Sequence, residues 1–105
     1  MKKFTQKDFL NRLEKLYKEN VEISRRKNAD YATDTDPFRN FRVCESIGIP
    51  AEVGILVRMT DKISRIRNLL GKKAQVKDET IFDTLSDLAN YAMILRIYLE
   101  ENGKI

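Results

Sequence analysis

The sequence contains no histidine and only one cysteine, Cys44. Without histidine, the chain has no imidazole for acid–base catalysis and none for binding a metal. A single cysteine forms neither an intramolecular disulfide nor a CxxC zinc site. Any bound metal would therefore be held by carboxylates, which suit a hard ion such as Mg²⁺. These absences exclude histidine-based enzymes and are typical of a reduced, intracellular protein.

Long apolar runs and long runs of one charge are also missing. No stretch approaches the roughly 18 apolar residues of a membrane span, and no hydrophobic segment follows the N-terminal Met-Lys-Lys. The net charge of +4 is spread along the chain without a block of five like charges. We therefore expect a soluble cytoplasmic protein with no membrane contact, and the charge does not indicate a nucleic-acid partner.

The 105 residues are enough for one small domain, so we treat 1–105 as a single unit. Apolar spacing and capping signals predict helices at about residues 5–28, 38–46, 50–70 and 78–101. Thr5 and Asp8 match a capping box, Gly71 ends the third helix, and Asp78 is the expected N-cap of the fourth. Because no segment alternates with period two, the predicted fold class is all-α: a small bundle of three long helices and one short one.

Apolar residues predict which helical faces are buried. The short helix should be anchored by Phe38, Phe41 and Val43. The third helix has apolar residues at spacings of three and four, which predict a core seam: Leu56, Met59, Ile63, Ile66 and Leu70. The second half of the fourth helix is apolar nearly all round, which predicts burial on more than one side. In so small a protein we therefore expect a symmetric homo-oligomer that completes the bundle.

Charged residues follow separate faces of the last two helices. The third helix has a mainly basic stripe: Arg58, Asp61, Lys62, Arg65 and Asn68. The fourth helix has an acidic stripe: Glu79, Asp83 and Asp87. Like charges one turn apart repel by a few tenths of a kcal/mol each, so a cation, basic side chains or solvent must offset the repulsion.

Two interpretations of the stripes stay open. In the first, an interhelical ion ladder pairs Arg58, Lys62 and Arg65 with Asp87, Asp83 and Glu79. In the second, the stripes bind a nucleotide phosphate and its Mg²⁺. Asp61 and Asn68 favour the second, because a ladder does not need them while sugar hydroxyls or a base edge would use them.

A third element is the segment Lys27-Asn-Ala-Asp30-Tyr31. The composition of this segment favours Asn28 and Asp30 as residues that end the first helix. Tyr31 could stack on a base instead, as aromatic side chains do in nucleotide sites.

Three ordered blocks of these residues resemble a phage-associated family, the nucleotide modification-associated domain of type one. The blocks are Lys27-x-x-Asp30-Tyr31, Arg58-x-x-Asp61-Lys62-x-x-Arg65-x-x-Asn68-Leu69, and Asp78-Glu79-x-x-x-Asp83-Thr84-x-x-Asp87-Leu88-x-x-Tyr91. That family is in turn similar to the MazG-like all-α nucleoside triphosphate pyrophosphohydrolases. In those enzymes, a four-helix bundle presents carboxylates from two helices to Mg²⁺.

The resemblance implies a nucleotide site on matching residues. The implied ligand-binding residues are Lys27, Asp30, Tyr31, Arg58, Asp61, Lys62, Arg65, Asn68, Asp87 and Tyr91. If a metal is bound, the implied ligands are Glu79 and Asp83. In the charged stripe of the third helix only Asp61 is acidic, and basic residues stand where the hydrolases have further carboxylates. Basic side chains bind phosphate without a metal, so this departure favours holding a nucleotide over cleaving it.

We therefore expect a phage or prophage protein that sequesters a nucleotide or a cyclic-nucleotide immune signal. Such a sequestering protein would act against host defences in the host cytoplasm. It would need no cofactor for binding, and no catalytic residue is assigned. The alternative is a Mg²⁺-dependent MazG-like pyrophosphohydrolase in modified-nucleotide metabolism. A third interpretation is a helical interaction module with an ion ladder and no ligand.

Overall fold

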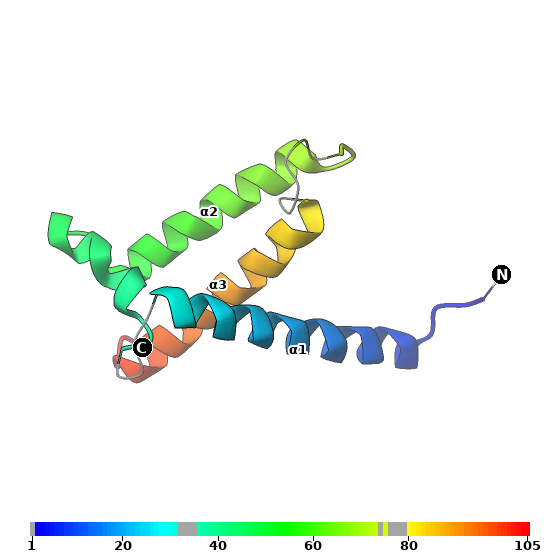
Figure 1. Cartoon of the computed structure of the whole chain (residues 1–105), viewed down its shortest axis with the longest axis horizontal. Helices are drawn as coiled ribbons and strands as arrows, with labels where there is room; N and C mark the ends of the chain where they lie inside the picture. Colours follow the sequence, from blue (N-terminus) through cyan, green and yellow to red (C-terminus); the bar gives the residue numbers. More distant parts are fainter. Residues whose placement is uncertain (1, 32–35, 74, 76–79) are drawn as a thin grey trace.

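The computed structural model describes residues 2–31, 36–73, 75 and 80–105, and every regular element within those ranges is helical (Figure 1). In chain order the elements are α1 (Gln6–Tyr31), the 3-10 helix η1 (Arg39–Ile47), α2 (Ala51–Leu69) and α3 (Ile81–Glu101). Three long helices and one short one are therefore present, and the predicted all-α fold class is confirmed. No helix in the described ranges combines the length and apolar character of a membrane span.

The start of α1 is fixed by the predicted capping box. The backbone N–H of Thr5 donates to Asp8 Oδ2 at 3.0 Å, and the N–H of Asp8 donates to Thr5 Oγ1 at 3.1 Å. The hydrogen bond from the Thr5 backbone to the Asp8 carboxylate, and after it a hydrogen bond from the Thr5 side chain, lower the pKa of Asp8. Because the pKa of this carboxyl is lower in the folded state than in the unfolded state, the ionised carboxylate stabilises the helix at pH values above the unfolded-state pKa. This contribution is lost as the pH falls through the folded-state pKa.

Other helix ends differ from the prediction. The helix α1 continues through Asn28 and Asp30, so these residues do not end it as predicted. Helix α3 begins at Ile81, with Thr80 as the N-cap, because Thr80 and Asp83 form a second capping box. The N-cap expected at Asp78 is therefore placed too early, and Asp78 itself lies outside the described residues.

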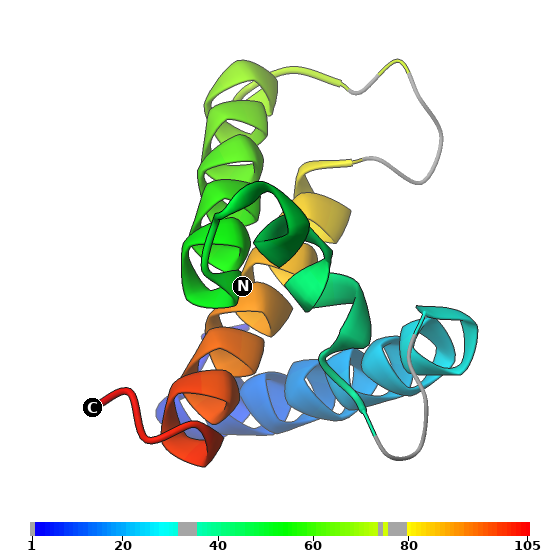
Figure 2. The same cartoon turned by 90° about the vertical axis from the view of Figure 1, so that its left-hand side faces the viewer.

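The helices α2 and α3 form a hairpin, and the C-terminal half of α1 crosses α3 (Figures 1 and 2). η1 lies beside the first turns of α2. Close approach here depends on Gly54, because a Cβ at that position would lie 2.6 Å from the Sγ of Cys44. The absence of a side chain at Gly54 thus allows η1 to present Phe41 beside α2.

The core lies where α2, α3 and η1 meet. Its buried apolar residues in the described part of the chain are Ala51, Ile55 and Tyr98. The Phe38 ring contacts the Tyr98 ring edge to face, with centroids 5.3 Å apart. Phe38 and Phe41 pack against this cluster as predicted, whereas Val43 is 65% exposed, so its predicted anchoring role is wrong.

The predicted seam of α2 is also displaced. Leu56, Ile63 and Leu70 are exposed, and only Met59 of the seam packs against the buried cluster. The buried face is centred near Ile55, which lies about 60° around the helix from the seam's centre at 100° per residue. This rotation turns the basic stripe of α2 toward its neighbours.

Candidate functional site

The basic stripe of α2 is divided by this rotation. Arg58, Lys62 and Arg65 are half-buried, whereas Asp61 and Asn68 are exposed. Asp61 and Asn68 lie on the flank of the stripe that is farther from the buried face. The three basic residues therefore lie nearer to the other helices. Asp61 and Asn68, which were expected to contact a sugar or a base, lie on the solvent side instead.

The centre of the site is a carboxylate held by two lysines from different helices. Asp87 on α3 contacts the Nζ of Lys27 on α1 at 3.1 Å through Oδ1. Its Oδ2 lies 3.4 Å from the Nζ of Lys62 on α2. Three helices thus converge on one carboxylate, and Lys27, from the third sequence element, joins the two stripes.

The contact between Lys62 and Asp87 corrects the register of the ion ladder. The ladder would place Asp87 opposite Arg58 and Asp83 opposite Lys62. The observed pairing is shifted by one turn, so that Asp87 meets Lys62. The Asp83 carboxylate instead closes the capping box, accepting from the backbone N–H of Thr80 at 3.1 Å and from Thr80 Oγ1 at 2.6 Å.

Arg58 is held by η1 rather than by the acidic stripe. Its guanidinium carbon lies 5.0 Å from the centroid of the Phe41 ring, a cation–π contact. One of its amino groups donates to the carbonyl oxygen of Asn40 at 3.5 Å. Phe41 also meets the Tyr91 ring nearly at right angles, with centroids 6.3 Å apart. The planar cation and two aromatic rings therefore form a continuous wall.

A cavity of about 320 Å³ opens beside this wall. Four of the implied ligand-binding residues line it: Lys27, Arg58, Asp87 and Tyr91. Lys62 reaches the same Asp87 carboxylate. With three cations and one carboxylate, this cluster carries a net charge of about +2, because Lys and Arg are protonated and Asp is ionised at neutral pH. The cavity is thus a positively charged pocket with an aromatic wall.

The remaining implied residues lie elsewhere. Asp30 is exposed in the last turn of α1, and the side chain of Tyr31 lies outside the described part of the structure. Arg65 is half-buried one turn beyond Lys62 on α2. Neither Asp30, Asp61, Arg65 nor Asn68 lines the 320 Å³ cavity.

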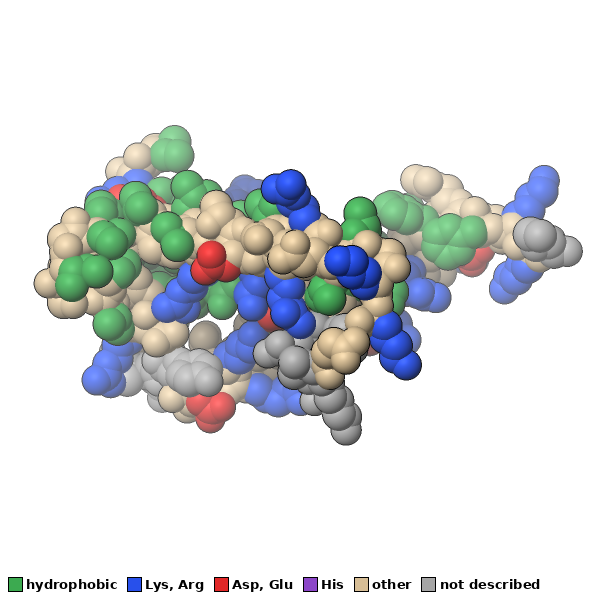
Figure 3. All heavy atoms as spheres, turned by 90° about the horizontal axis from the view of Figure 1, so that it is seen from above, with side chains coloured by type: hydrophobic (Ala, Val, Ile, Leu, Met, Phe, Trp, Pro, Cys, Tyr) green, Lys and Arg blue, Asp and Glu red, His purple; other side chains and the backbone are tan. Residues whose placement is uncertain are grey.

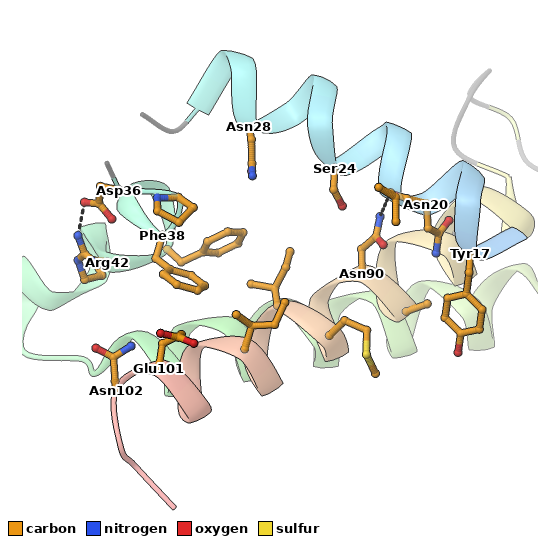
Figure 4. Close-up of a pocket in the computed structure, with 17 residues that line it drawn as sticks. Tyr17, Asn20, Ser24, Asn28, Asp36, Phe38, Arg42, Asn90, Glu101 and Asn102 are labelled. Carbon is orange, nitrogen blue, oxygen red and sulfur yellow. Dashed lines mark hydrogen bonds and ion pairs between the residues drawn. The ribbon is translucent and has the colours of Figure 1, made fainter. Parts of the chain in front are cut away.

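Several polar lining residues were missed from the sequence. Ser24 and Asn28 on α1, Asn40 on η1 and Asn90 on α3 all border the cavity. Asn90 Nδ2 donates to the carbonyl oxygen of Asn20 at 3.4 Å, which joins α3 to α1. Figure 4 shows Ser24, Asn28 and Asn90 pointing into the space between these helices. A signal was present in the spacing of Asn20, Ser24 and Asn28, which places one polar stripe on α1.

The donors expected for a metal are not gathered at this site. Glu79 lies outside the described residues, and the Oδ2 of Asp83 is engaged by Thr80. No group of three or more acidic, cysteine or histidine side chains suited to a metal occurs in the described ranges. Asp87 is neutralised by two lysines. The carboxylates that are described therefore do not fit a Mg²⁺ cage, which needs several oxygen donors around one ion.

The capping role of Asp83 gives a direct prediction. Replacing Asp83 with alanine should lower the free energy of unfolding by about 1 kcal/mol, the usual contribution of a cap. Thr80→Ala is the matched control, because it removes the other half of the same box. Urea denaturation with and without Mg²⁺ measures the free energy of unfolding of both variants. A stabilisation by Mg²⁺ that Asp83→Ala abolishes and Thr80→Ala keeps would contradict the capping interpretation.

Comparison with known proteins adds one match. The family model described as nucleotide modification associated domain 1 matches residues 27–99. This span begins at Lys27 and contains the six charged and aromatic residues of the pocket and its wall: Lys27, Phe41, Arg58, Lys62, Asp87 and Tyr91. No curated protein and no solved structure matches the chain.

Proposed function

The chain belongs to the nucleotide modification associated domain 1 family, and from this premise we propose that it binds and sequesters an intact nucleotide or a cyclic-nucleotide signal. The observation that carries the proposal is the pocket in which Lys27 and Lys62 hold the Asp87 carboxylate, while Arg58 lies over the ring of Phe41 in the aromatic wall. Its volume, about 320 Å³, falls at the lower end of the roughly 300–1,000 Å³ of small-molecule sites.

The cationic cluster supplies the phosphate contacts. An ammonium group has three N–H donors, so Lys27 and Lys62 can each hold Asp87 and a phosphate oxygen at once. Arg58 has five donors in a planar fork that matches a phosphate in two-point contact. Because Asp87 fixes both lysines before the ligand arrives, less side-chain freedom is lost on binding.

The rest of the pocket supplies contacts for a base and a sugar. Aromatic rings provide stacking surfaces for a base, and here Phe41 and Tyr91 form the wall beside Arg58. Asn28, Asn40 and Asn90 border the cavity, and an amide both donates and accepts hydrogen bonds. This combination suits a base edge or a ribose hydroxyl better than a simple inorganic anion.

Holding the ligand, rather than hydrolysing it, is supported by the charge of the site. Hydrolysis between phosphates on the MazG-like pattern uses several carboxylate-bound Mg²⁺ ions to activate water and neutralise the leaving group. The pocket instead has three basic side chains and one carboxylate that is already paired. Sequestration of this kind would suit a small phage protein that removes a nucleotide signal of host defence.

The test exposes purified protein to a broad nucleotide panel that includes cyclic dinucleotides and cyclic ADP-ribose forms. The protein is then removed by filtration and heat-denatured, and both fractions are analysed by chromatography with mass detection. We expect one nucleotide class to be depleted from the filtrate and to return unchanged on denaturation, with or without EDTA. New products in the filtrate that vanish with EDTA would replace sequestration with hydrolysis. A panel that passes through entirely would contradict both.

A further inference from the structure

A single chain exposes much more surface than a folded monomer of its size. Its accessible surface is 8577 Å², whereas a monomer of 12.3 kDa exposes about 6,100 Å². Its radius of gyration is 16.1 Å, against about 13 Å for a compact domain of this length. Permanent dimers bury roughly 2,000–5,000 Å² in total, or about 1,000–2,500 Å² per chain, so the excess of roughly 2,500 Å² per chain is enough for such an interface.

Part of this excess lies on the N-terminal half of α1. Figure 1 shows this half projecting beyond the α2–α3 hairpin, and Figure 3 shows hydrophobic and basic side chains along the projecting end. Its exposed apolar residues are Phe9, Leu10, Leu13, Leu16 and Tyr17. Their spacings of three and four place them on one helical face. We call this face the α1 arm.

A second part of the excess lines an open groove between α1 and α3, shown in Figure 4. The groove has a volume of about 900 Å³. Its walls include Val21 on α1 and Met93 and Ile97 on α3, which are 59%, 46% and 51% exposed. The α1 wall of the groove continues the face of the α1 arm, because Tyr17 belongs to both.

We propose that the groove between α1 and α3 is occupied by the α1 arm of a second copy of this chain, in a reciprocal two-fold dimer. An amphipathic helix laid into an apolar groove is a common mode of recognition. Because one helix carries both the arm and a groove wall, a two-fold axis near the middle of α1 lets each copy fill the other's groove. The two α1 helices then pack antiparallel.

Size and charge both fit this occupant. A standard interface buries about 800 Å² per partner, which the excess surface of each chain exceeds. Residues 2–18 contain six basic and two acidic side chains. The groove carries the carboxylates of Asp36 and Glu101 and one basic residue, Arg42, which is paired with Asp36. A basic arm and a weakly acidic groove attract each other. A membrane could cover the arm, but it would not fill a concave groove.

The dimer also concerns the proposed nucleotide site, because Ser24, Asn28 and Asn90 border both the groove and the charged pocket. The docked arm would therefore cover one side of that pocket. This consequence rests on the proposed function, whereas the dimer itself does not. Oligomeric state is consequently measured without nucleotide, so that failure of one proposal is distinguishable from failure of the other.

Light scattering after size exclusion tests the interface on the full chain. We expect the wild type at micromolar concentration to have about twice the monomer mass. Leu13→Glu on the arm and Met93→Glu in the groove should each give a monomer. Ile63→Glu on α2 is the matched control, because Ile63 is 47% exposed, like Met93 at 46%, but does not line the groove. It should remain a dimer. A monomeric wild type would overturn the proposal, and its flotation with anionic vesicles would identify a membrane as the partner of the α1 arm instead. Dissociation by Ile63→Glu alone would also overturn the proposal.

Crosslinking keeps the test decisive if a charged variant fails to fold. In a Cys44→Ala background, Leu13→Cys protein is mixed with Met93→Cys protein and mildly oxidised. We expect a mixed disulfide of twice the monomer mass on a non-reducing gel. Leu13→Cys mixed with Ile63→Cys is the control and should give little of this product. Equal yields from the two mixtures, or none from the first, would show that the arm does not occupy the groove.

Discussion

Replacing Arg58 with alanine is expected to weaken nucleotide binding by about 10- to 100-fold, because hydrogen bonds to a charged group contribute about 1.5–3 kcal/mol. Among the described residues that line the charged pocket, Arg58 alone has the planar guanidinium that binds a phosphate in two-point contact. Its position over Phe41 and its bond to Asn40 fix the guanidinium before the ligand arrives. Calorimetric titration with the nucleotide identified by the filtration experiment measures the loss.

Two variants of α2 serve as controls for Arg58→Ala. Arg58→Lys keeps the charge but loses the planar fork, so it should bind with intermediate affinity. Arg67→Ala removes an exposed arginine from the same helix, and its affinity should stay within about twofold of the wild type. If Arg67→Ala weakened binding as much as Arg58→Ala, the interaction would depend on net charge rather than on this pocket. Thermal unfolding of each variant separates lost binding from lost structure.

Replacing Tyr98 with alanine is expected to lower the free energy of unfolding by about 3–5 kcal/mol, the usual cost of removing a buried aromatic ring. Tyr98 is 4% exposed and contacts the core formed with Ala51 and Ile55. It also carries the edge-to-face contact with Phe38, which joins the start of η1 to α3. Since so few side chains in the described part of the chain are buried, this loss should leave much of the protein unfolded at 25 °C. Urea denaturation followed by circular dichroism measures it.

Tyr98→Phe is the matched control for this prediction. It keeps the ring and its packing against Phe38, so its free energy of unfolding should change by less than about 1.5 kcal/mol, as volume-conserving substitutions do. A Tyr98→Ala protein with wild-type stability would mean that the core near η1 contributes little. In that case the position of Phe41, and with it the aromatic wall of the pocket, would need another explanation.

The ion ladder and the ligand site are not exclusive alternatives in this fold. The Lys62–Asp87 contact is one rung of a ladder, but the same carboxylate also holds Lys27 from α1. Exposed ion pairs contribute about 0–1 kcal/mol, so stability alone is a weak reason for two lysines at one carboxylate. A carboxylate that positions both ammonium groups for an anion gives a stronger reason, and the nucleotide experiments test it.

The local elements of this protein were determined by the sequence itself. Helical spacing predicted three long helices and one short one, and the pattern around Thr5 and Asp8 predicted the first capping box. The polarity of the α2 and α3 faces was also readable, because residues three and four apart share a face whatever the surroundings. Helix ends were less certain, since Thr80 and Asp78 are both good N-caps and only one can begin the helix.

Tertiary structure alone decided which of these faces meet. Lys27 and Asp87 are sixty residues apart, and no local spacing relates them. The buried face of α2 is turned from its apolar seam toward the basic stripe, because η1 and α3 both pack near Ile55 and Gly54 leaves room for η1. This turn brought Arg58 onto Phe41 and Lys62 onto Asp87, and it left Asp61 and Asn68 exposed. Helix identity follows from nearest neighbours along the chain, whereas the pocket depends on how whole helices pack against one another, which periodicity does not encode.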